Sequence, residues 1–522
     1  MPSLSEGKPY LVEGRNLVLI PDTDDYRPWV PDDATFVTLH GLPLWACKHT
    51  PELNNLLFEI GEHIPAPIFF EDYDWANIEI FAEQAQMAGL ISARRRCYNL
   101  SEMGCGKTIG ALLAIDYLIE KGHIERACII APLSILWDVW QHEIMMRFPR
   151  LRPVVLHGSY DKRTKLLHQR SWNVAIINHD GIGVIHDELL RCNFGCIIVD
   201  EAASFRDSRT RKFKLMQRLL KEVPFAGALT GSPTPNAPSD AYGLAKLFTP
   251  ERITMGFRSF RQTLEVEVHP NRWLPKPSAS TKVFNLLQPA VRFKRSEIIS
   301  LKEFSSQTRR VGLSTMQKEA MAQLKKEAIV RFEEGDVEGR NAVTLIGKLL
   351  QICSGAVYTT DKAVVDLKAQ PRYDMVRSVL DEAEGKVIVL APYIHCTELL
   401  HSNLRKDYSV AVVNGSVPAK ERVEIFRSFG DKRDPMRVLI GHPKVLAHGL
   451  NLTAANVVVW FAPIYSREIY EQANARITRL GQTREQLILH LSSGREEDAV
   501  YAALEKKGTM QDVILAMFEQ SN

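Results

Sequence analysis

The sequence of 522 residues has little excess charge of either sign and no long apolar run. No window approaches the roughly 18 uninterrupted apolar residues that a membrane-spanning helix requires. The opening segment, MPSLSEGKPYLVEGR, lacks the basic end and the apolar stretch of a secretory signal. We therefore expect a cytoplasmic protein without a targeting signal and without a membrane partner.

Cysteine is also scarce, and its spacing excludes a disulfide scaffold. Eight cysteines are spread from Cys47 to Cys396, and the one close pair, Cys192 and Cys196, has no second pair to complete a zinc site. We expect reduced thiols that bind no metal. The 65 Lys and Arg against 62 Asp and Glu leave a net charge of only +3, so any nucleic-acid surface must be local.

Short apolar runs recur in two parts of the chain, Cys97 to Thr230 and Lys386 to Leu491, and segments with helical spacing follow them. Runs that are apolar throughout are typical of strands covered on both faces, which indicates a parallel α/β sheet in each part. We predict two parallel-sheet lobes, 71–265 and 371–522. A mostly helical bridge or insertion, 266–370, separates them, and 1–70 form a small accessory domain that we consider for substrate recognition.

The strongest motif is the run SEMGCGKT, residues 101–108, which follows an apolar run and opens a helical segment. A phosphate cradle needs small residues whose backbone N–H groups converge on oxygens, a lysine for the β- and γ-phosphates, and a hydroxyl for Mg²⁺. The run provides all three, so ATP and Mg²⁺ are the expected cofactors. The predicted contacts come from Met103, Gly104, Cys105, Gly106, Lys107 and Thr108.

Two further motifs follow strand-like runs downstream. Asp200 and Glu201 end one run, where Asp200 can hold Mg²⁺ and Glu201 can orient and deprotonate a water molecule. A solvated strand end is the alternative. Thr230, Gly231 and Ser232 end the next run, where we expect them to couple the γ-phosphate to the rest of the protein, although such clusters are also common in simple turns.

The order of these motifs resembles that of superfamily 2 helicases, and the second lobe makes the resemblance specific. The runs GLNLTAA at 449–455 and QANARITRLGQ at 472–482 resemble the closing motifs of the SNF2 family. The resemblance covers the chain from about Phe81 onward. It implies two RecA-like lobes and ATP contacts from Gln84, Gly449, Asn451 and Gln472. Gln86 is the alternative to Gln84, and either glutamine could instead be a solvated helix residue.

The resemblance also assigns two arginines of the second lobe, Arg476 and Arg479, to catalysis beside Lys107 and Glu201. Negative charge builds up on the γ-phosphoryl oxygens in the transition state, and a guanidinium group placed there can contribute roughly 10³ to 10⁵ in rate. This sequence departs from the family pattern at Ser101, Ala203 and His448, the last standing where the family often has a small residue. Ser101 stands at the first position of the cradle, and Ala203 stands where the family has a histidine.

The family's implied track is DNA, in double-stranded form. We therefore predict an ATP-dependent DNA translocase or remodeller of compact prokaryotic or viral type that acts as a monomer. The alternatives are a strand-separating or branch-migrating helicase and an ATP-gated DNA- or protein-binding scaffold; protein partners are not predicted. Expected DNA contacts are Ser134, Asn178, Thr234, Asn236 and Thr453. Local basic groups occur at 94–96, 206–214 and 292–295, and Trp29, Trp45 and Trp75 either stack on bases or pack a small core.

Overall fold

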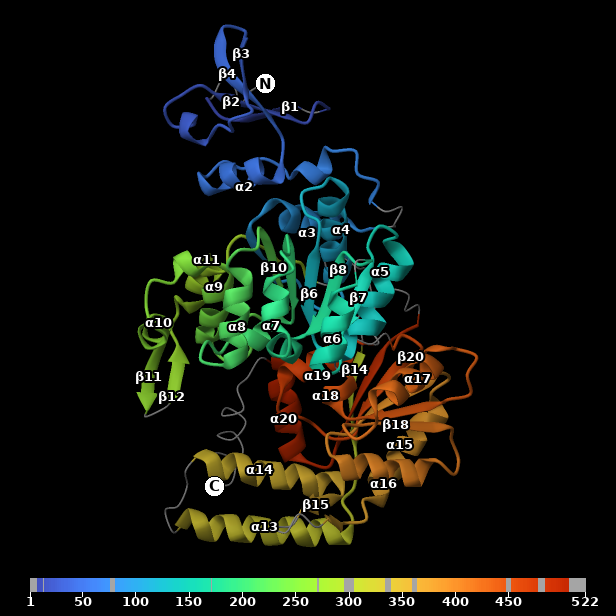
Figure 1. The fold of residues 1–522 in the computed structure, drawn as a ribbon. Coiled ribbons are helices and arrows are strands. Elements are labelled where there is room, and N and C mark those ends of the chain that lie inside the picture. Colours follow the sequence, from blue (N-terminus) through green and yellow to red (C-terminus); the bar gives the residue numbers. More distant parts are fainter. Residues whose placement is uncertain are drawn as a thin grey trace. The chain divides into compact units, whose positions relative to one another are not determined.

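The structure is a computed structural model that describes residues 7–12, 14–75, 80–169, 171–269, 272–294, 305–333, 339–358, 364–446, 452–476 and 484–506. It divides into two compact units, Met1–Ile299 and Ser300–Asn522. Each unit contains one large sheet in which all paired strands run parallel (Figure 1). The predicted α/β class with two parallel-sheet lobes is therefore confirmed.

The first unit is built on a sheet with the strand order β13-β5-β10-β9-β6-β8-β7. Its strands are β5 (Arg96–Asn99), β6 (Ala127–Ala131), β7 (Pro153–Leu156), β8 (Val174–Asn178), β9 (Cys196–Asp200), β10 (Phe225–Leu229) and β13 (Ala290–Val291). Its helices are α3 (Ala82–Ala93), α4 (Lys107–Glu120), α5 (His142–Arg147), α6 (Tyr160–Leu167), α7 (His186–Leu190), α8 (Arg211–Leu220), α9 (Ala241–Phe248), α10 (Phe257–Leu264) and α11 (Ala279–Leu286).

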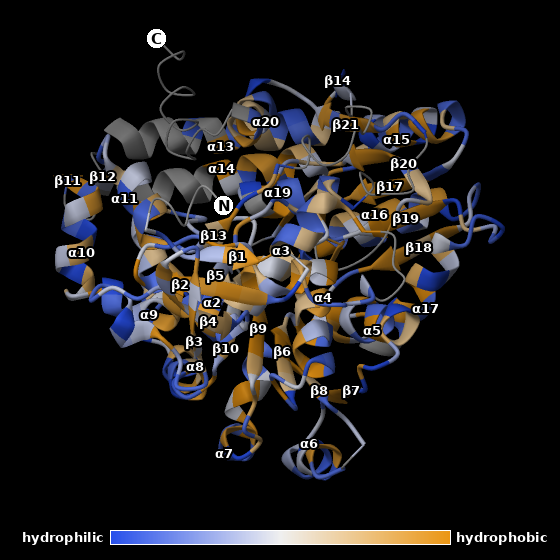
Figure 2. Cartoon of the chain, turned by 90° about the horizontal axis from the view of Figure 1, so that it is seen from above, coloured by the Kyte–Doolittle hydropathy of each residue, from blue (hydrophilic) through white to orange (hydrophobic). Residues whose placement is uncertain are grey.

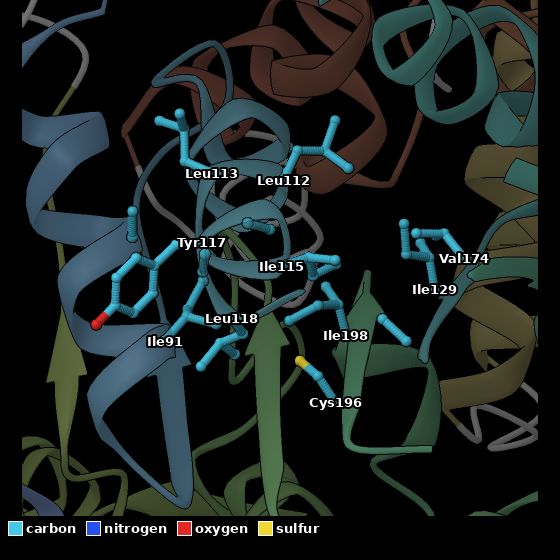
Figure 3. Close-up of a cluster of buried hydrophobic side chains, with 14 of the residues drawn as sticks. Ile91, Leu112, Leu113, Ile115, Tyr117, Leu118, Ile129, Val174, Cys196 and Ile198 are labelled. Carbon is cyan, nitrogen blue, oxygen red and sulfur yellow. The ribbon is translucent and has the colours of Figure 1, made fainter. Parts of the chain in front are cut away.

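The central strands of this sheet are buried on both faces, which explains why β6 is apolar at every position and β9 at every position except Asp200. Ile129 and Ile198 pack with Leu112 and Ile115 of α4 on one face (Figure 3). Their neighbours Ile130 and Val199 belong to a separate cluster on the other face. Successive side chains of a strand point to opposite faces, so both must be hydrophobic here. Figure 2 shows the resulting apolar strands in orange.

The N-terminal part of the first unit forms a small antiparallel sheet with its own core. Strands β1 (Tyr10–Val12), β2 (Leu17–Pro21), β3 (Thr35–Leu39) and β4 (Leu42–Lys48) lie in the order β1-β2-β4-β3 and precede α2 (Pro51–Glu59). Val18, Ile20, Leu53 and Leu57 are among the buried side chains that join sheet and helix. Thr50 caps α2, because its side chain accepts a hydrogen bond from the Leu53 amide at 3.2 Å.

The second unit contains a sheet with the order β14-β21-β20-β17-β19-β18. Its strands are β14 (Ser305–Arg310), β17 (Lys386–Leu390), β18 (Val410–Val413), β19 (Val438–Gly441), β20 (Ala455–Trp460) and β21 (Leu487–Ser492). Its helices are α13 (Thr315–Glu333), α14 (Gly339–Ser354), α15 (Gln370–Glu382), α16 (Ile394–Leu404), α17 (Ala419–Gly430), α18 (Pro443–Leu446), α19 (Arg467–Asn474) and α20 (Arg495–Lys506).

The segment 266–370, for which we expect a mostly helical bridge, contributes to both large sheets. Strand β13 pairs with β5 in the first unit, and β14 pairs with β21 in the second. The long helices of this segment are α13 and α14. The segment also contains α11 and two antiparallel pairs, β11 (Glu265–His269) with β12 (Arg272–Pro275) and β15 (Ala356–Tyr358) with β16 (Val364–Asp366).

Two expected absences can be compared with the described residues. No helix among them combines the length and the apolar character needed to cross a bilayer. All eight cysteines are buried and form no disulfide, and no group of three or more His, Cys, Asp and Glu side chains within the described ranges is arranged to hold a metal ion.

Candidate nucleotide site

The glycine-containing loop of the first unit joins β5 to the first turn of α4. Gly104 and Gly106 have φ angles of 84° and 76°, in the left-handed region that glycine adopts without strain. The Lys107 ammonium group donates hydrogen bonds to the carbonyl oxygens of Ser101 at 2.7 Å and Glu102 at 3.0 Å. The loop is therefore a closed arch at the start of a 14-residue helix, where free backbone N–H groups favour an anion.

Gln84 of α3 lies directly against this arch. Its Oε1 accepts a hydrogen bond from the Phe81 amide at 3.0 Å, and a Cβ atom added to Gly106 would lie 2.1 Å from its Nε2. Gln84 is 5% exposed, whereas Gln86 is exposed on the far side of the same helix turn. The structure thus brings Gln84, and not Gln86, to the loop.

The carboxylate pair lies at the end of β9, the strand beyond β10 in the sheet. Asp200 is 9% exposed, and its two oxygens are held separately: Oδ2 accepts from Trp140 Nε1 at 3.1 Å, and Oδ1 accepts from the Glu201 amide at 3.0 Å. Glu201 has a φ of 49°, a left-handed conformation that is strained for a glutamate. The arrangement fixes the orientation of Asp200 and turns the chain sharply at Glu201.

The third motif follows β10, the strand between β5 and β9, and reaches the same arch. Thr230 is buried, and its hydroxyl lies 3.2 Å from the Ser232 carbonyl oxygen and 3.3 Å from the Ser232 amide. A Cβ atom added to Gly231 would lie 3.5 Å from the Ser101 carbonyl oxygen and 3.8 Å from Lys107 Nζ. The three motifs of the first unit therefore meet at the carboxyl edge of one parallel sheet, where ligands of such folds bind.

Two contacts at this site were not predicted from the sequence. The Phe293 carbonyl oxygen accepts from the Glu102 amide at 3.0 Å and from Cys105 Sγ at 3.5 Å, while the Phe293 amide donates to Ser101 Oγ at 3.2 Å. These contacts are largely backbone-mediated, so no motif marks Phe293.

The second unpredicted contact involves His179, which follows β8. Its Nε2 lies 2.8 Å from the Asp200 carbonyl oxygen, and its ring packs edge-on against Phe205. Ala203 is buried at 4% exposure. An imidazole therefore does contact the carboxylate strand, although it comes from the end of β8, which β6 separates from β9, and not from position 203.

In the second unit, α19 carries Gln472, and Arg476 lies two residues beyond the end of this helix at Asn474. Gln472 and Arg476 are 3% and 5% exposed, and the Arg476 carbonyl oxygen accepts from the Leu452 amide at 3.3 Å. Asn474, between them, accepts a hydrogen bond from Trp460 Nε1 at 2.9 Å, which fixes α19 on the sheet. His448, Gly449, Asn451 and Arg479 lie outside the described residues.

The expected DNA contacts lie in varied environments. Ser134 and Asn236 are exposed, and Thr234 and Thr453 are half-buried. Asn178 is also half-buried, and its Oδ1 lies 3.3 Å from both terminal nitrogens of Arg163, a buried arginine.

Two residues of the first basic cluster, Arg94 and Arg96, form their contacts within the first unit. Arg94 packs over the Phe58 ring at 4.2 Å and donates to the Asn54 carbonyl oxygen, while Arg96 donates to the carbonyl oxygens of Leu220 at 2.6 Å and Val223 at 2.8 Å. Burial lowers the pKa of each guanidinium to about 10. These contacts hold both guanidinium groups within the fold of the first unit.

The three tryptophans considered for base stacking also differ. Trp45 donates to Asp22 Oδ1 at 2.9 Å, and Trp75 stacks on Phe69 with ring centroids 6.0 Å apart. Both are part of the local packing. Trp29 is 39% exposed.

Fold and site together define an α/β protein with a glycine-containing loop between a strand and a helix in one unit and a second parallel-sheet unit after it. Residues 92–356 match the SNF2-related domain family, and residues 371–481 match the helicase conserved C-terminal domain. The chain therefore belongs to the SNF2-related family, and the resemblance of its motifs is confirmed.

Relatives of this family include viral, bacterial and animal proteins. The chain is 25% identical over 439 residues to protein p41 of Acyrthosiphon pisum secondary endosymbiont phage 1, and equally so to YwqA of Bacillus subtilis, whose name describes an ATP-dependent helicase/translocase. The alignments cover 79% of this chain, 90% of p41 and 46% of YwqA, so the chain spans less than half of the bacterial relative. The Sulfolobus solfataricus SWI2/SNF2 ATPase core, solved with dsDNA, is 19% identical with a TM-score of 0.41, covering 82% of this chain and 91% of that one.

Proposed function

We propose that the chain is a DNA-stimulated ATPase that uses ATP hydrolysis to move along double-stranded DNA or to displace proteins from it. The observation that carries this proposal is the convergence of the glycine loop, the carboxylate pair and the Thr230 turn at one sheet edge. The proposal is also supported by the family match of the second unit, because such an enzyme requires a second lobe.

The residues at this edge fit ATP and Mg²⁺. Lys107 carries the cation for the β- and γ-phosphates, and the amides of residues 103–108 provide the backbone donors. Thr108 and Asp200 would hold Mg²⁺, since hydroxyl and carboxylate oxygens are its preferred ligands. The bound nucleotide supplies the γ-phosphoryl group, and Glu201 orients the attacking water and accepts its proton.

Further groups of residues have proposed roles in nucleotide binding, catalysis, coupling and DNA binding. Gln84, whose amide lies against the loop, reads the adenine edge. Gly449, Asn451 and Gln472 contribute ATP contacts from the second unit, and Arg476 and Arg479 stabilise the charge that develops on the γ-phosphoryl oxygens. Thr230, Gly231 and Ser232 couple the state of the γ-phosphate to the DNA-binding surface. Proposed DNA contacts are Ser134, Asn178, Thr234, Asn236 and Thr453.

The decisive experiment measures phosphate release with single-stranded DNA, duplex DNA and RNA. We expect duplex DNA to stimulate turnover most. Glu201→Gln should retain ATP and lower turnover at least about 100-fold, because general-base catalysis is lost. Glu125→Gln is the matched control, since Glu125 is exposed and precedes β6 at the opposite edge of the sheet. Normal turnover in Glu201→Gln would reject the assigned role.

A second assay separates movement along the duplex from strand separation, because the bacterial relative's name covers both. Displacement of the third strand of a triplex, without unwinding of a forked duplex, supports translocation. Efficient unwinding of the fork would instead favour the strand-separating helicase.

A further inference from the structure

The N-terminal 64 residues carry a charge opposite to that of the rest of the chain. They contain ten Asp and Glu but only four Lys and Arg, a formal charge of −6, whereas the whole chain carries +3. The remaining 458 residues therefore carry +9. A surface of negative charge is repelled by phosphate, so DNA is a poor ligand for this part of the molecule.

This acidic part contains a cavity of about 500 Å³ between the 3-10 turn η1 (Arg27–Trp29) and the start of α2. Its apolar wall includes Trp29, whose side chain is 39% exposed. The charged residues that line it are Asp32, Asp33, Lys48 and Glu52, and Pro31 lies beside them. Exposed indole surface beside carboxylates is the combination that attracts cations.

The carboxylates of the cavity are not neutralised from within. Asp32 and Asp33 are exposed, and neither forms an ion pair or a side-chain hydrogen bond with another residue that the structure describes. Asp22 in the same domain contrasts with them, because it binds Arg27 at 3.0 Å. Lys48 is the single lysine or arginine among the lining residues, against three carboxylates.

We propose that this cavity is the docking site for a basic, arginine-containing segment of a partner protein. A guanidinium group can stack on an indole face and at the same time form paired hydrogen bonds with carboxylates, which an ammonium group does less well. The N-terminal domain then selects the protein on which the ATPase acts, while the basic remainder of the chain contacts DNA. The proposal extends the first unit's role beyond nucleotide binding.

The test uses the full chain and two labelled peptides, (Gly-Ser-Arg)₄ and (Gly-Ser-Glu)₄, in fluorescence anisotropy at about 0.15 M salt, where screening limits long-range attraction to roughly 8 Å. The arginine peptide should bind and the glutamate peptide should not. Trp29→Ala and the double variant Asp32→Asn/Asp33→Asn should each weaken binding about tenfold, as the loss of a cation–π contact or of charge-assisted hydrogen bonds implies.

The matched control is Asp24→Asn/Asp25→Asn, which removes the same charge from exposed positions of the same domain outside the cavity. It should change the affinity less than about twofold. Thermal unfolding must be unchanged in all variants. No binding of the arginine peptide, unchanged affinity in Trp29→Ala, or equal losses in the two double variants would overturn the proposal, the last because it would indicate only a diffuse acidic field.

Discussion

A buried ion pair in the second unit gives the sharpest test of its packing. Arg372 of α15 and Glu497 of α20 are 1% and 0% exposed in their side chains. The guanidinium donates to Glu497 Oε1 at 3.0 Å and to Oε2 at 2.5 Å, and also to Ser493 Oγ at 2.6 Å. The pair therefore fixes the C-terminal helix α20 to α15 through a fully desolvated, two-point contact.

The expected change in stability follows from burial. Glu497→Gln leaves the Arg372 cation in the interior without its counter-ion, which costs about 3–5 kcal/mol. Replacing both residues by apolar ones, Arg372→Met with Glu497→Leu, removes both charges but leaves the Phe461 carbonyl oxygen without its donor and removes both partners of Ser493. Ser493 is half-buried and can bond to water instead, so the expected cost is mainly that of the Phe461 carbonyl group, about 1–3 kcal/mol. The double variant should thus be more stable than the single one.

Hydrogen exchange read by mass spectrometry, on peptides covering 370–382 and 495–506 of the full chain, measures this local stability. The control is Glu382→Gln, which breaks a paired contact of the same geometry, with Arg309 at 2.6 and 2.8 Å, on the protein surface. Exchange should hardly change there, because water screens the exposed pair. Equal effects of the two single substitutions, or a double variant less stable than Glu497→Gln, would refute the burial argument.

Three other predictions concern the site and its support. Gln84→Ala should raise the KM for ATP roughly three- to tenfold, the worth of one hydrogen bond, while Gln86→Ala leaves it unchanged; equal effects in steady-state kinetics would contradict the assignment. Trp140→Phe removes the donor to Asp200 and should lower kcat about tenfold with KM for ATP nearly constant; a higher KM at normal kcat would argue against that orienting role. Burial lowers the pKa of His490 to about 4, so the unfolded chain, with a pKa near 6.5, binds its proton first as the pH falls. Stability should fall by about 3 kcal/mol from this group between pH 6.5 and 4, and a denaturant series in which His490→Phe shows the same pH slope would contradict the account.

Much of the fold could be predicted because its signal is carried by side chains. The buried strands β6, β9, β17 and β20 have apolar side chains on both faces, so their sequences predict strands that are covered on both sides. The loop glycines were predictable for a similar reason, since a left-handed backbone with a close neighbour excludes a Cβ atom at Gly106.

Elements whose partners are backbone groups escaped prediction. Strand β14 reads SSQTRR and is mostly exposed, yet all six of its residues pair with β21. An edge strand needs no apolar face on its open side, so its sequence resembles a loop. Strand β13 has only two residues, which is too short for its sequence to predict a strand. For Arg94 and Arg96 the sequence misleads in the other direction. A run of charged residues usually lies in solvent, whereas the guanidinium groups of these two arginines form hydrogen bonds within the fold.

The substitution at Ser101 is explained by the same backbone pairing. The amides of Tyr98, Leu100 and Glu102 donate in turn to the carbonyl oxygens of Pro289, Val291 and Phe293, so the ladder between β5 and β13 continues into the glycine-containing loop. The Ser101 hydroxyl accepts the Phe293 amide, which lies 192 residues away in the sequence. The entry of the loop is thus held as part of the sheet, and a small hydroxyl side chain suits that position because it completes the pairing without a charge. Phe293 lies only six residues before the first unit ends at Ile299. Any shift of Phe293 must break or carry with it the hydrogen bonds of Ser101 and Glu102, and so disturb the loop that we propose binds phosphate.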